Sequence, residues 1–404
     1  MANMIARTPT VGELERAAEV AQIAFGSLSL EHWVESFHKV NDMFGREFTI
    51  VVEVDGQIVS TLLCCPAPIY VAECRVTHSS VGGVATLPDY RKLGCAGVMM
   101  AETVKRLRKS GIATSSLWPF SYDYYRKFGW EVGAEVRKYG APGSVYAALG
   151  NAGNARAATK EDFGAIMDCY NTLAPTLNCL TERSKEWWHR MSCVPEDLSM
   201  VTESGRGAVV HMNGKSIDGY AVYDVAVKDE SRWIEVKEMF SDSPGARMDM
   251  LALLATIDPE LTINFHSPVE DSFMQELPNP RLVSCAVAPS FQFRVIDPEL
   301  AMKSLTADEE VSGRFTLSLS DPVFKHGFEF GVDVDEGEVS LCKPERKNRL
   351  DMDVQTLARL YSGYLSPLEA YYLGKVRADD VTPVLLACET FPQLQPYRSW
   401  LEPG

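Results

Sequence analysis

The stretch VATLPDYRKLGCAGVMM, residues Val84–Met100, joins an apolar segment to a Gly-rich turn and then to a helical pattern. Residues from about Ser79 to Thr86 are mostly apolar and predict a strand. Apolar residues recur at helical spacing after the turn, at Ala96, Met100, Val104 and Leu107. The stretch therefore predicts a strand that ends in a tight turn and leads directly into an amphipathic helix.

This turn is suited to bind a pyrophosphate. A helix N-terminus exposes N–H groups that have no partner within the helix, and it carries a partial positive charge. Gly94 and Gly97 would let phosphates approach the backbone closely, and Arg91 and Lys92 add positive charge at the same place. The alternative is that the glycines only ease a tight turn and that Arg91 is a solvated surface charge. A Walker A loop and a Gly-x-Gly-x-x-Gly motif are both absent.

The flanking sequence predicts a mixed α/β domain around the turn. Residues from about 12 to 45 show the periodicity of helices. The segment FTIVVEVDGQIVSTLLCC (48–65) predicts a β-hairpin, because Asp55-Gly56 tolerates the positive φ angles of a type I′ turn. Gly111 is expected to end the helix after the turn, and ATSSLWPF (113–120) predicts the next strand.

Two further regions follow a segment that we interpret as a linker, YGAPGSVYAALGNAGNAR (139–156). The region up to about 289 repeats the order of the first, but its equivalent turn, EMFSDSPGARMDML (238–251), lacks Arg-x-x-Gly-x-Ala. We expect that turn not to hold a phosphate. From Phe293 onward, alternating segments predict an antiparallel sheet. The end of the sequence, PQLQPYRSWLEPG (392–404), has three prolines and predicts an extended tail.

Composition narrows the class of protein and its partners. At 404 residues, two or three domains are expected. The net charge of −16 argues against nucleic acid and suits a cationic substrate; the alternative is an acidic protein whose charge has no role in binding. No stretch of 18 residues lacks charges, so no membrane span is expected. The cysteines are scattered and no export signal precedes them, which predicts a cytoplasmic protein with reduced thiols. The histidines do not lie near them at ligand spacing, so no metal is expected.

The motif Arg-x-x-Gly-x-Ala, after a strand that ends in Val-Ala-Thr, resembles the acetyl-CoA motif of Gcn5-related N-acetyltransferases (GNAT). The resemblance implies that the strand binds the pantetheine arm and that main-chain N–H groups of the turn bind the pyrophosphate. The predicted coenzyme contacts are Val84, Ala85, Thr86, Arg91, Lys92, Leu93, Gly94, Cys95, Ala96 and Gly97, together with Phe120 and Ser121.

A tyrosine follows at the position where these transferases often place one, just before the Phe-Gly-aromatic turn of YYRKFGW (124–130). Attack of an amine on a thioester releases a thiolate, and a phenol near the sulfur can give it a proton. Tyr125 is therefore the predicted proton donor. The alternative is that Tyr122, Tyr124 and Tyr125 are all packing aromatics.

The whole chain resembles the Eis (enhanced intracellular survival) family of acetyltransferases. The segments that carry the resemblance are VATLPDYRKLGCAGVMM, YYRKFGW, the Trp187-Trp188 helix and FRVIDPELAMKSL (293–305). It implies an α/β (α+β) architecture: an active GNAT domain over 1–150, a degenerate second GNAT-like domain over 151–290, and a sterol-carrier-protein-like domain over 291–404. It also implies acetylation of amines, with aminoglycosides as the well-known substrates, and a homohexamer.

The same resemblance implies an unusual base, because in that family the terminal carboxylate of the chain deprotonates the attacking amine. The corresponding position is Gly404, at the end of an extended segment that Tyr397, Trp400 and Leu401 would anchor. Family members end in a bulky apolar residue, whereas this chain ends in glycine, and Glu402 is a competing candidate. The remaining alternative is a frayed tail without function.

Two functions are compatible with these observations. The first is an acetyl-CoA-dependent N-acetyltransferase that acts on a cationic small molecule, aminoglycoside-like, polyamine or lysine-type. Direct attack in a ternary complex is expected, because no cysteine is placed as an acyl carrier. The second is a non-catalytic lipid- or CoA-binding module. Trp33, Phe37 and Trp118 are candidate walls of the acceptor pocket, although core packing explains them equally well.

Overall fold

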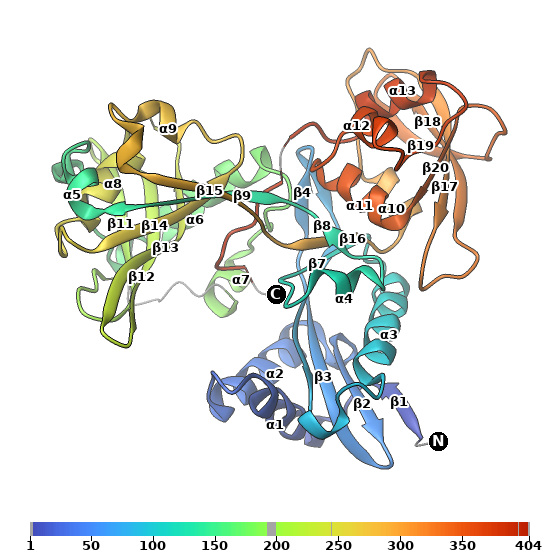
Figure 1. Cartoon of the computed structure of the whole chain (residues 1–404), viewed down its shortest axis with the longest axis horizontal. Helices are drawn as coiled ribbons and strands as arrows, with labels where there is room; N and C mark the ends of the chain where they lie inside the picture. Colours follow the sequence, from blue (N-terminus) through green and yellow to red (C-terminus); the bar gives the residue numbers. More distant parts are fainter. Residues whose placement is uncertain (1–2, 192–198, 244, 395, 403–404) are drawn as a thin grey trace. The chain divides into compact units, whose positions relative to one another are not determined.

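The computed structural model describes residues 3–191, 199–243, 245–394 and 396–402. Contacts along the chain divide it into two compact units. The first unit combines Met1–Gly133 with Phe291–Gln393, and the second combines Ala134–Ser290 with Leu394–Glu402. Both units are mixtures of helices and mixed sheets, so the predicted α/β class is confirmed (Figure 1).

The first unit is built on a seven-stranded sheet. In spatial order its strands are β1 (Met4–Arg7), β2 (Thr49–Val54), β3 (Gln57–Pro66), β6 (His78–Thr86), β7 (Thr114–Leu117), β16 (Gln292–Val295) and β8 (Glu131–Val132). Helices α1 (Leu14–Phe25) and α2 (Leu30–Phe44) cover one face, and α3 (Cys95–Lys109) lies along the other (Figure 1). The predicted hairpin joins β2 to β3, and both residues of its turn have positive φ angles, +48° at Asp55 and +84° at Gly56.

The apolar stripe of α3 packs against this sheet as its periodicity predicts. Met100, Val104 and Leu107 are at most 1% exposed, and they contact buried strand residues such as Val52 and Leu62. Burial of apolar surface stabilises this packing and fixes the direction of the helix axis. The N-terminus of α3 is consequently held at the end of β6, where the predicted anion-binding turn lies.

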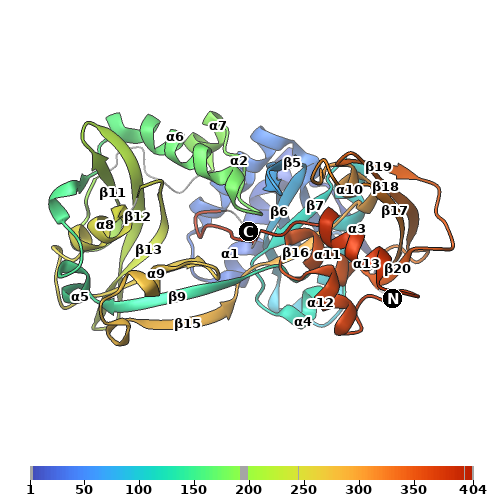
Figure 2. The same cartoon turned by 90° about the horizontal axis from the view of Figure 1, so that it is seen from above.

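The second unit repeats this plan with a second seven-stranded sheet. In spatial order its strands are β10 (Ala155–Ala157), β11 (Gly205–Asn213), β12 (Ser216–Lys228), β13 (Ser231–Ser241), β14 (Thr262–Pro268), β9 (Glu135–Pro142) and β15 (Ser284–Pro289). Its helices are α5 (Gly143–Ala147), α6 (Phe163–Leu173), α7 (Lys185–Arg190), α8 (Ala246–Leu254) and α9 (Phe273–Glu276). Figure 2 shows β9 and β15 running beside each other in this sheet.

Residues 139–156, interpreted as a linker, instead contain ordered elements of the second unit. Tyr139, Ala141 and Tyr146 are buried in its core, in β9 and α5. Gly140 faces the Asn264 side chain so closely that an added Cβ would lie 2.6 Å from Asn264 Oδ1. Close packing against the neighbouring strand therefore explains Gly140, and Gly150 packs as closely against the backbone of Met248 in α8.

Each large sheet takes its sixth strand from a distant part of the sequence. In the first unit this strand is β16, between β7 and β8; in the second it is β9, between β14 and β15. The first division between the units therefore lies at Gly133 and not at the expected 150, whereas the second lies at Ser290, as expected. The first unit ends its opening segment at Gly133 and resumes at Phe291.

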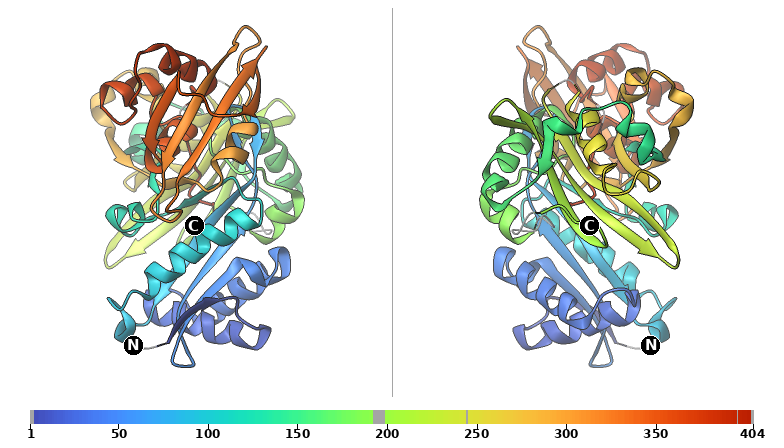
Figure 3. Two further views of the ribbon diagram at one scale, coloured as in Figure 1. Left: turned by 90° about the vertical axis from the view of Figure 1, so that its right-hand side faces the viewer. Right: turned by 90° about the vertical axis from the view of Figure 1, so that its left-hand side faces the viewer.

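The segment of the first unit that follows β16 contains a four-stranded sheet with helices beside it (Figure 3, left). Its strands are β17 (Gly313–Ser320), β18 (Phe328–Asp335), β19 (Glu338–Cys342) and β20 (Arg349–Asp353), and its helices are α10 (Pro298–Lys303), α11 (Val354–Ser362), α12 (Pro367–Tyr372) and α13 (Thr382–Thr390). The antiparallel pairing predicted here holds for β17, β18 and β19, whereas β20 runs parallel to β17. A buried ion pair of 2.7 Å, Arg294–Asp321, ties β16 to this region.

Candidate functional site

A pocket of about 770 Å³ runs along β6 and the N-terminus of α3 in the first unit. Its size is typical of sites for small molecules and cofactors. The predicted coenzyme contacts that line it are Val84, Ala85, Thr86, Arg91, Lys92, Gly94, Cys95, Ala96, Gly97 and Phe120. Tyr125, the predicted proton donor, lines the same pocket. The structure thus brings the strand, the turn and the tyrosine together.

The backbone of the turn presents the N-terminus of α3 to this pocket. Gly94 is the N-cap with φ of +93°, a conformation that favours glycine. The bond from Val98 N to Gly94 O, 3.1 Å long, is the first of the helix. The N–H groups of Cys95, Ala96 and Gly97 precede it and have no acceptor within the helix. This arrangement is suited to bind an anion.

The cationic side chains of the turn lie at the mouth of the pocket. Arg91 Nε donates to the carbonyl of Thr86 over 3.3 Å, which holds the guanidinium near the end of β6. Lys92 adopts φ of +65°, in the left-handed region. Two of the predicted contacts do not line the pocket. Leu93 is 59% exposed, and Ser121 instead accepts a hydrogen bond from Tyr124 N at the start of α4 (Tyr122–Arg126).

The strand β6 is shaped by a bulge beside the pocket. Its register against β3 shifts between Gly82 and Ala85, so Gly83 and Val84 together face the single residue Leu62. Gly83 has φ of +60°, and a Cβ there would lie 3.3 Å from the ring of Trp33. Pairing of β6 with β7 stops at Ser80, so the strands separate where the predicted contacts begin.

Tyr125 is held in an aromatic cluster on α4. Its side chain is 2% exposed, and its ring centroid lies 5.2 Å from those of Phe120 and of Tyr124. Burial, with a smaller contribution from Tyr124, raises the pKa of the Tyr125 phenol above its ordinary value. The phenol therefore stays protonated at neutral pH, which is the state that a proton donor requires.

Residues from the second part of the first unit hold α4 in place. Gly129, which follows α4, has φ of +92°, and a Cβ there would collide with the buried guanidinium of Arg294. Arg126 binds Glu131 through two hydrogen bonds of 2.7 and 2.8 Å, and Arg359 contacts the same carboxylate at 3.1 Å. The position of Tyr125 thus depends on residues far from it in sequence.

The candidate wall residues separate into two groups. Trp118 lines the pocket, whereas Trp33 and Phe37 are buried at 7% and 0% exposure and belong to the packing beneath β6. Sequence reasoning missed Phe25, at the end of α1, and the pair Gly82-Gly83. The glycine pair carried a usable signal, because adjacent glycines within a strand indicate a bulge or a close approach of a ligand.

The second unit has its own turn from β13 to α8, with a smaller pocket of about 290 Å³. Gly245 is the N-cap of α8, with φ of +80°. Arg247 is ion-paired with Asp271 and with Glu276. Tyr397 from the tail lines this pocket, and its hydroxyl donates to the carbonyl of His266 over 3.4 Å. The tail therefore forms part of the wall of this pocket.

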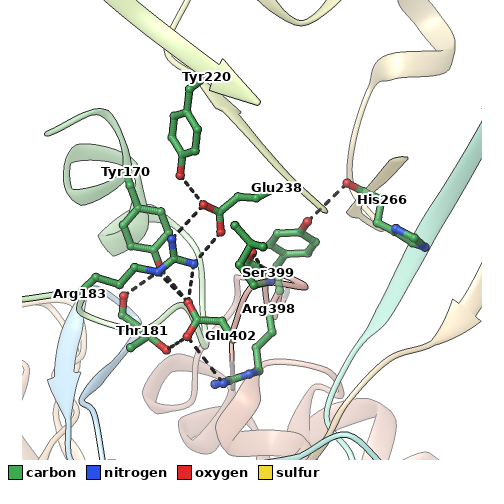
Figure 4. A network of polar contacts seen from close by, with 11 residues as sticks. Tyr170, Thr181, Arg183, Tyr220, Glu238, His266, Arg398, Ser399 and Glu402 are labelled. Atoms are coloured by element: carbon green, nitrogen blue, oxygen red, sulfur yellow. Dashed lines mark hydrogen bonds and ion pairs between the residues drawn. The ribbon is translucent and has the colours of Figure 1, made fainter. Parts of the chain in front are cut away.

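The tail is anchored by a buried charged network (Figure 4). Glu402 accepts from Thr181 Oγ1 at 2.6 Å and from Arg183 Nη2 at 2.7 Å. Arg183 also binds Glu238 through bonds of 2.9 and 2.6 Å, and its guanidinium lies 3.8 Å from the ring centroid of Tyr170. The side chains of Arg183, Glu238 and Glu402 are 0% exposed.

The predicted anchors of the tail are only part of this arrangement. Tyr397 and Leu401 are buried, while Trp400 is 40% exposed and packs on the His266 ring at 4.7 Å. The carboxylate of Glu402 is enclosed by its donors, so it is not available as a base in this structure. Gly404, the predicted proton acceptor, lies outside the described residues.

Within the described ranges, no three His, Cys, Asp or Glu side chains are grouped as ligands for a metal ion. Among the helices of the same residues, none combines the length and the apolar character needed to cross a membrane.

Three family matches follow one another along the chain. Residues 6–133 match an acetyltransferase (GNAT) domain, residues 179–295 match a second family with the same description, and residues 298–399 match a sterol carrier protein domain. An uncharacterized N-acetyltransferase of Streptomyces griseus is 24% identical over 329 residues, which is 76% of this chain and 77% of that protein.

Solved structures share the whole fold at low sequence identity. A GCN5-related N-acetyltransferase from Anabaena variabilis superposes with a TM-score of 0.83 at 16% identity, and the match covers 100% of both chains. A probable N-acyltransferase from Enterococcus faecalis gives 0.83 at 18% identity, over 98% of this chain and 100% of that one. Eis1 from Mycobacterium abscessus gives 0.75 at 18% identity, over 98% and 99%.

Proposed function

Because the chain belongs to the GNAT acetyltransferases and carries a C-terminal sterol carrier protein domain, we propose that it acetylates the amine of a small cationic molecule. Acetyl-CoA is the donor, and both substrates are bound when the amine attacks. The observation that carries this proposal is that one pocket joins the N-terminus of α3 to the protonated phenol of Tyr125.

The proposed reaction uses each end of this pocket. Arg91, Lys92 and the N–H groups of α3 bind the pyrophosphate of acetyl-CoA. A neutral amine attacks the thioester carbonyl, forms the C–N bond and displaces the coenzyme thiolate. Tyr125 gives that thiolate its proton, and the new amide loses one proton to a base.

Direct attack is favoured over an acyl-enzyme by the environment of Cys95. This thiol is 1% exposed at the first residue of α3, and burial raises its pKa. A thiol nucleophile needs the thiolate form, which burial disfavours. The amine therefore reacts with the coenzyme itself in this proposal.

The terminal carboxylate of Gly404 is proposed as the base, on resemblance to the Eis family. The support from the chain is the Glu402 anchor, because two residues extend at most about 7 Å beyond it. Such a short segment restricts where a terminal carboxylate can lie. A homohexamer is also proposed, on family resemblance alone, and sedimentation would test it. A cytoplasmic location is proposed from the scattered cysteines.

The acceptor is proposed to be a cation because the chain carries a net charge of −16, which raises the local concentration of cations. Release of free CoA thiol from acetyl-CoA would be measured with a panel of aminoglycosides, polyamines and lysine peptides. Acetylation of at least one amine supports the proposal. Coenzyme binding without release on any amine would instead support a CoA-binding module.

The role of Gly404 has a separate test. A short peptide appended after Gly404 moves the carboxylate away and should reduce turnover at least 10-fold, with unchanged affinity for acetyl-CoA. The matched control is the same peptide at the N-terminus. Turnover that survives the C-terminal extension would reject the terminal carboxylate as the base.

A further inference from the structure

The end of the first-unit pocket away from the helix N-terminus has no role in binding the coenzyme phosphates. It is lined by Phe25 from the end of α1, by Gly82 and Gly83 from β6, and by Trp118 after β7. These residues share an aromatic or side-chain-free surface. The acetyl group of a coenzyme bound along β6 would point toward this end, so an acceptor amine has to enter here.

We propose that the acceptor is a primary amine carried on an aromatic body, with a single positive charge, such as an arylalkylamine. The inference rests on the proposed function and narrows its acceptor. Three observations carry it: the aromatic walls, the bare floor between them and the distribution of charge around the pocket.

The walls are aromatic and one of them is accessible. Phe25 is 47% exposed, although its ring packs on Trp33 with centroids 5.1 Å apart. The ring of Trp118 packs edge-to-face against the ring of Phe291, with centroids 6.2 Å apart. Aromatic rings pack favourably against a further ring in offset or edge geometry, and their faces also attract an ammonium group.

The floor between these walls has no side chains. Gly82 and Gly83 leave the backbone of β6 bare, and the Trp33 ring lies directly beneath Gly83, 3.3 Å from where a Cβ would be. A planar ring can lie on this bare stretch of strand between the aromatic walls without displacing any protein side chain.

The charges around the pocket are unfavourable for a polycation. Among the described residues that line it, the charged side chains are Arg91 and Lys92, both cationic and both at the phosphate end. A polyamine or an aminoglycoside would bring several ammonium groups into a space whose lining residues supply no carboxylate. A monoamine brings a single ammonium group into this space, and that group loses its charge when it is deprotonated before the attack.

The experiment compares kcat/KM for phenethylamine with kcat/KM for spermidine, an aminoglycoside and N-α-acetyl-lysine, with product identified by mass spectrometry. We expect phenethylamine to be preferred at least 10-fold. A preference for spermidine or the aminoglycoside would overturn this inference while the proposed function stands. Failure of every amine, the aromatic one included, would overturn the proposed function itself.

Variants of Phe25 test the site directly. Phe25→Ala should lower kcat/KM for phenethylamine about 10-fold, leave that for ethylamine within about twofold and leave acetyl-CoA affinity unchanged. Leu28→Ala is the matched control, because Leu28 is 43% exposed in the same connection but does not line the pocket. Phe25→Glu should shift the preference toward spermidine. Equal losses for phenethylamine and ethylamine in Phe25→Ala would contradict an aromatic subsite.

Discussion

The two units contain the same strand-to-helix turn and use it differently. Gly94 in the first unit and Gly245 in the second both form the N-cap of a helix, with φ of +93° and +80°. The first turn carries Arg91 and Lys92 at an open pocket of about 770 Å³. The second turn has its arginine, Arg247, committed to Asp271 and Glu276, and the pocket of about 290 Å³ is lined in part by the tail.

This difference shows that the backbone of a turn can persist after its binding groups have changed. A glycine N-cap and a following helix are common to both units, so neither is enough to predict a ligand. The two turns differ in their side chains and in the residues that line the pocket beside each of them. In the second unit, Tyr397 of the tail forms part of the wall of the pocket beside this turn.

The largest expected effect comes from breaking the anchor of the tail in the second unit. Arg183→Met leaves Glu238 and Glu402 buried without their main partner, and removal of one member of a buried ion pair costs about 3–5 kcal/mol. Denaturant unfolding followed by fluorescence measures the loss. Arg190→Met is the control, because its ion pair with Glu186 is exposed and should contribute less than about 1 kcal/mol. Equal effects of both variants would contradict a special role for the buried network.

The next largest effect is expected for Tyr125, which lines the pocket beside the turn of the first unit. Tyr125→Phe removes the proposed proton donor and should reduce kcat about 10- to 100-fold, or ~1.4–2.7 kcal/mol in activation free energy. Acetyl-CoA affinity should change little. Tyr124→Phe, its ring neighbour, is the control and should retain most activity. A packing role alone would instead lower stability and leave kcat near its original value.

The two arginines give the most direct contrast between the turns. Arg91→Ala should weaken acetyl-CoA binding about 10-fold, or ~1.4 kcal/mol, because a phosphate contact is lost. Arg247→Ala should leave that affinity unchanged, although it will lower stability. Calorimetry measures both values and should give one coenzyme per chain. A stoichiometry of two would show that the second turn is also a coenzyme site.

The smallest effect is a pH dependence of the tail anchor. Burial raises the pKa of Glu402. The positive charges of Arg183 and Arg398, together with hydrogen bonds to the carboxylate, lower this pKa by a larger amount, so the net shift is downward. A carboxyl group whose pKa is lower in the folded state than in the unfolded state stabilises the fold. This stabilisation is fully present at pH values above the ordinary glutamate pKa, and it is lost as the pH falls through the pKa of the folded state. Glu402→Gln should therefore flatten the decline in stability below about pH 4.5, relative to the original chain. Parallel declines in both proteins would assign the acid sensitivity to other carboxylates.

Local features of the first unit were predictable from sequence. The hairpin at Asp55-Gly56 and the helix after Gly94 depend on residues within a few positions of each other, so their signals are contained in short windows. Sequence reasoning also selected most residues that line the first pocket. Leu93 and Ser121 were predicted as coenzyme contacts but do not line it. The wall residue Phe25 was missed because its place depends on how α1 packs beside β6.

Features that depend on distant partners were not predictable. The anchor joins Arg183 to Glu402 across 219 positions, and no periodicity records such a pairing. The glycines and alanines of 139–156 indicated a linker by composition, whereas Gly140 packs closely against a neighbouring strand and Gly150 against α8. The placement of strands β9 and β16 likewise follows from long-range pairing, which puts the first division between the units at Gly133 and not at 150.

Strand β16 is translated after all the other strands of the first sheet, and this order has a consequence for folding during synthesis on the ribosome. When residues 1–150 have emerged, β7 and β8 lack β16, the strand that pairs with both. Their edges present unpaired backbone groups, which invite pairing with other chains. The nascent protein must shield these edges until more than half of its length has been translated, so a gene truncated after codon 150 should yield insoluble product.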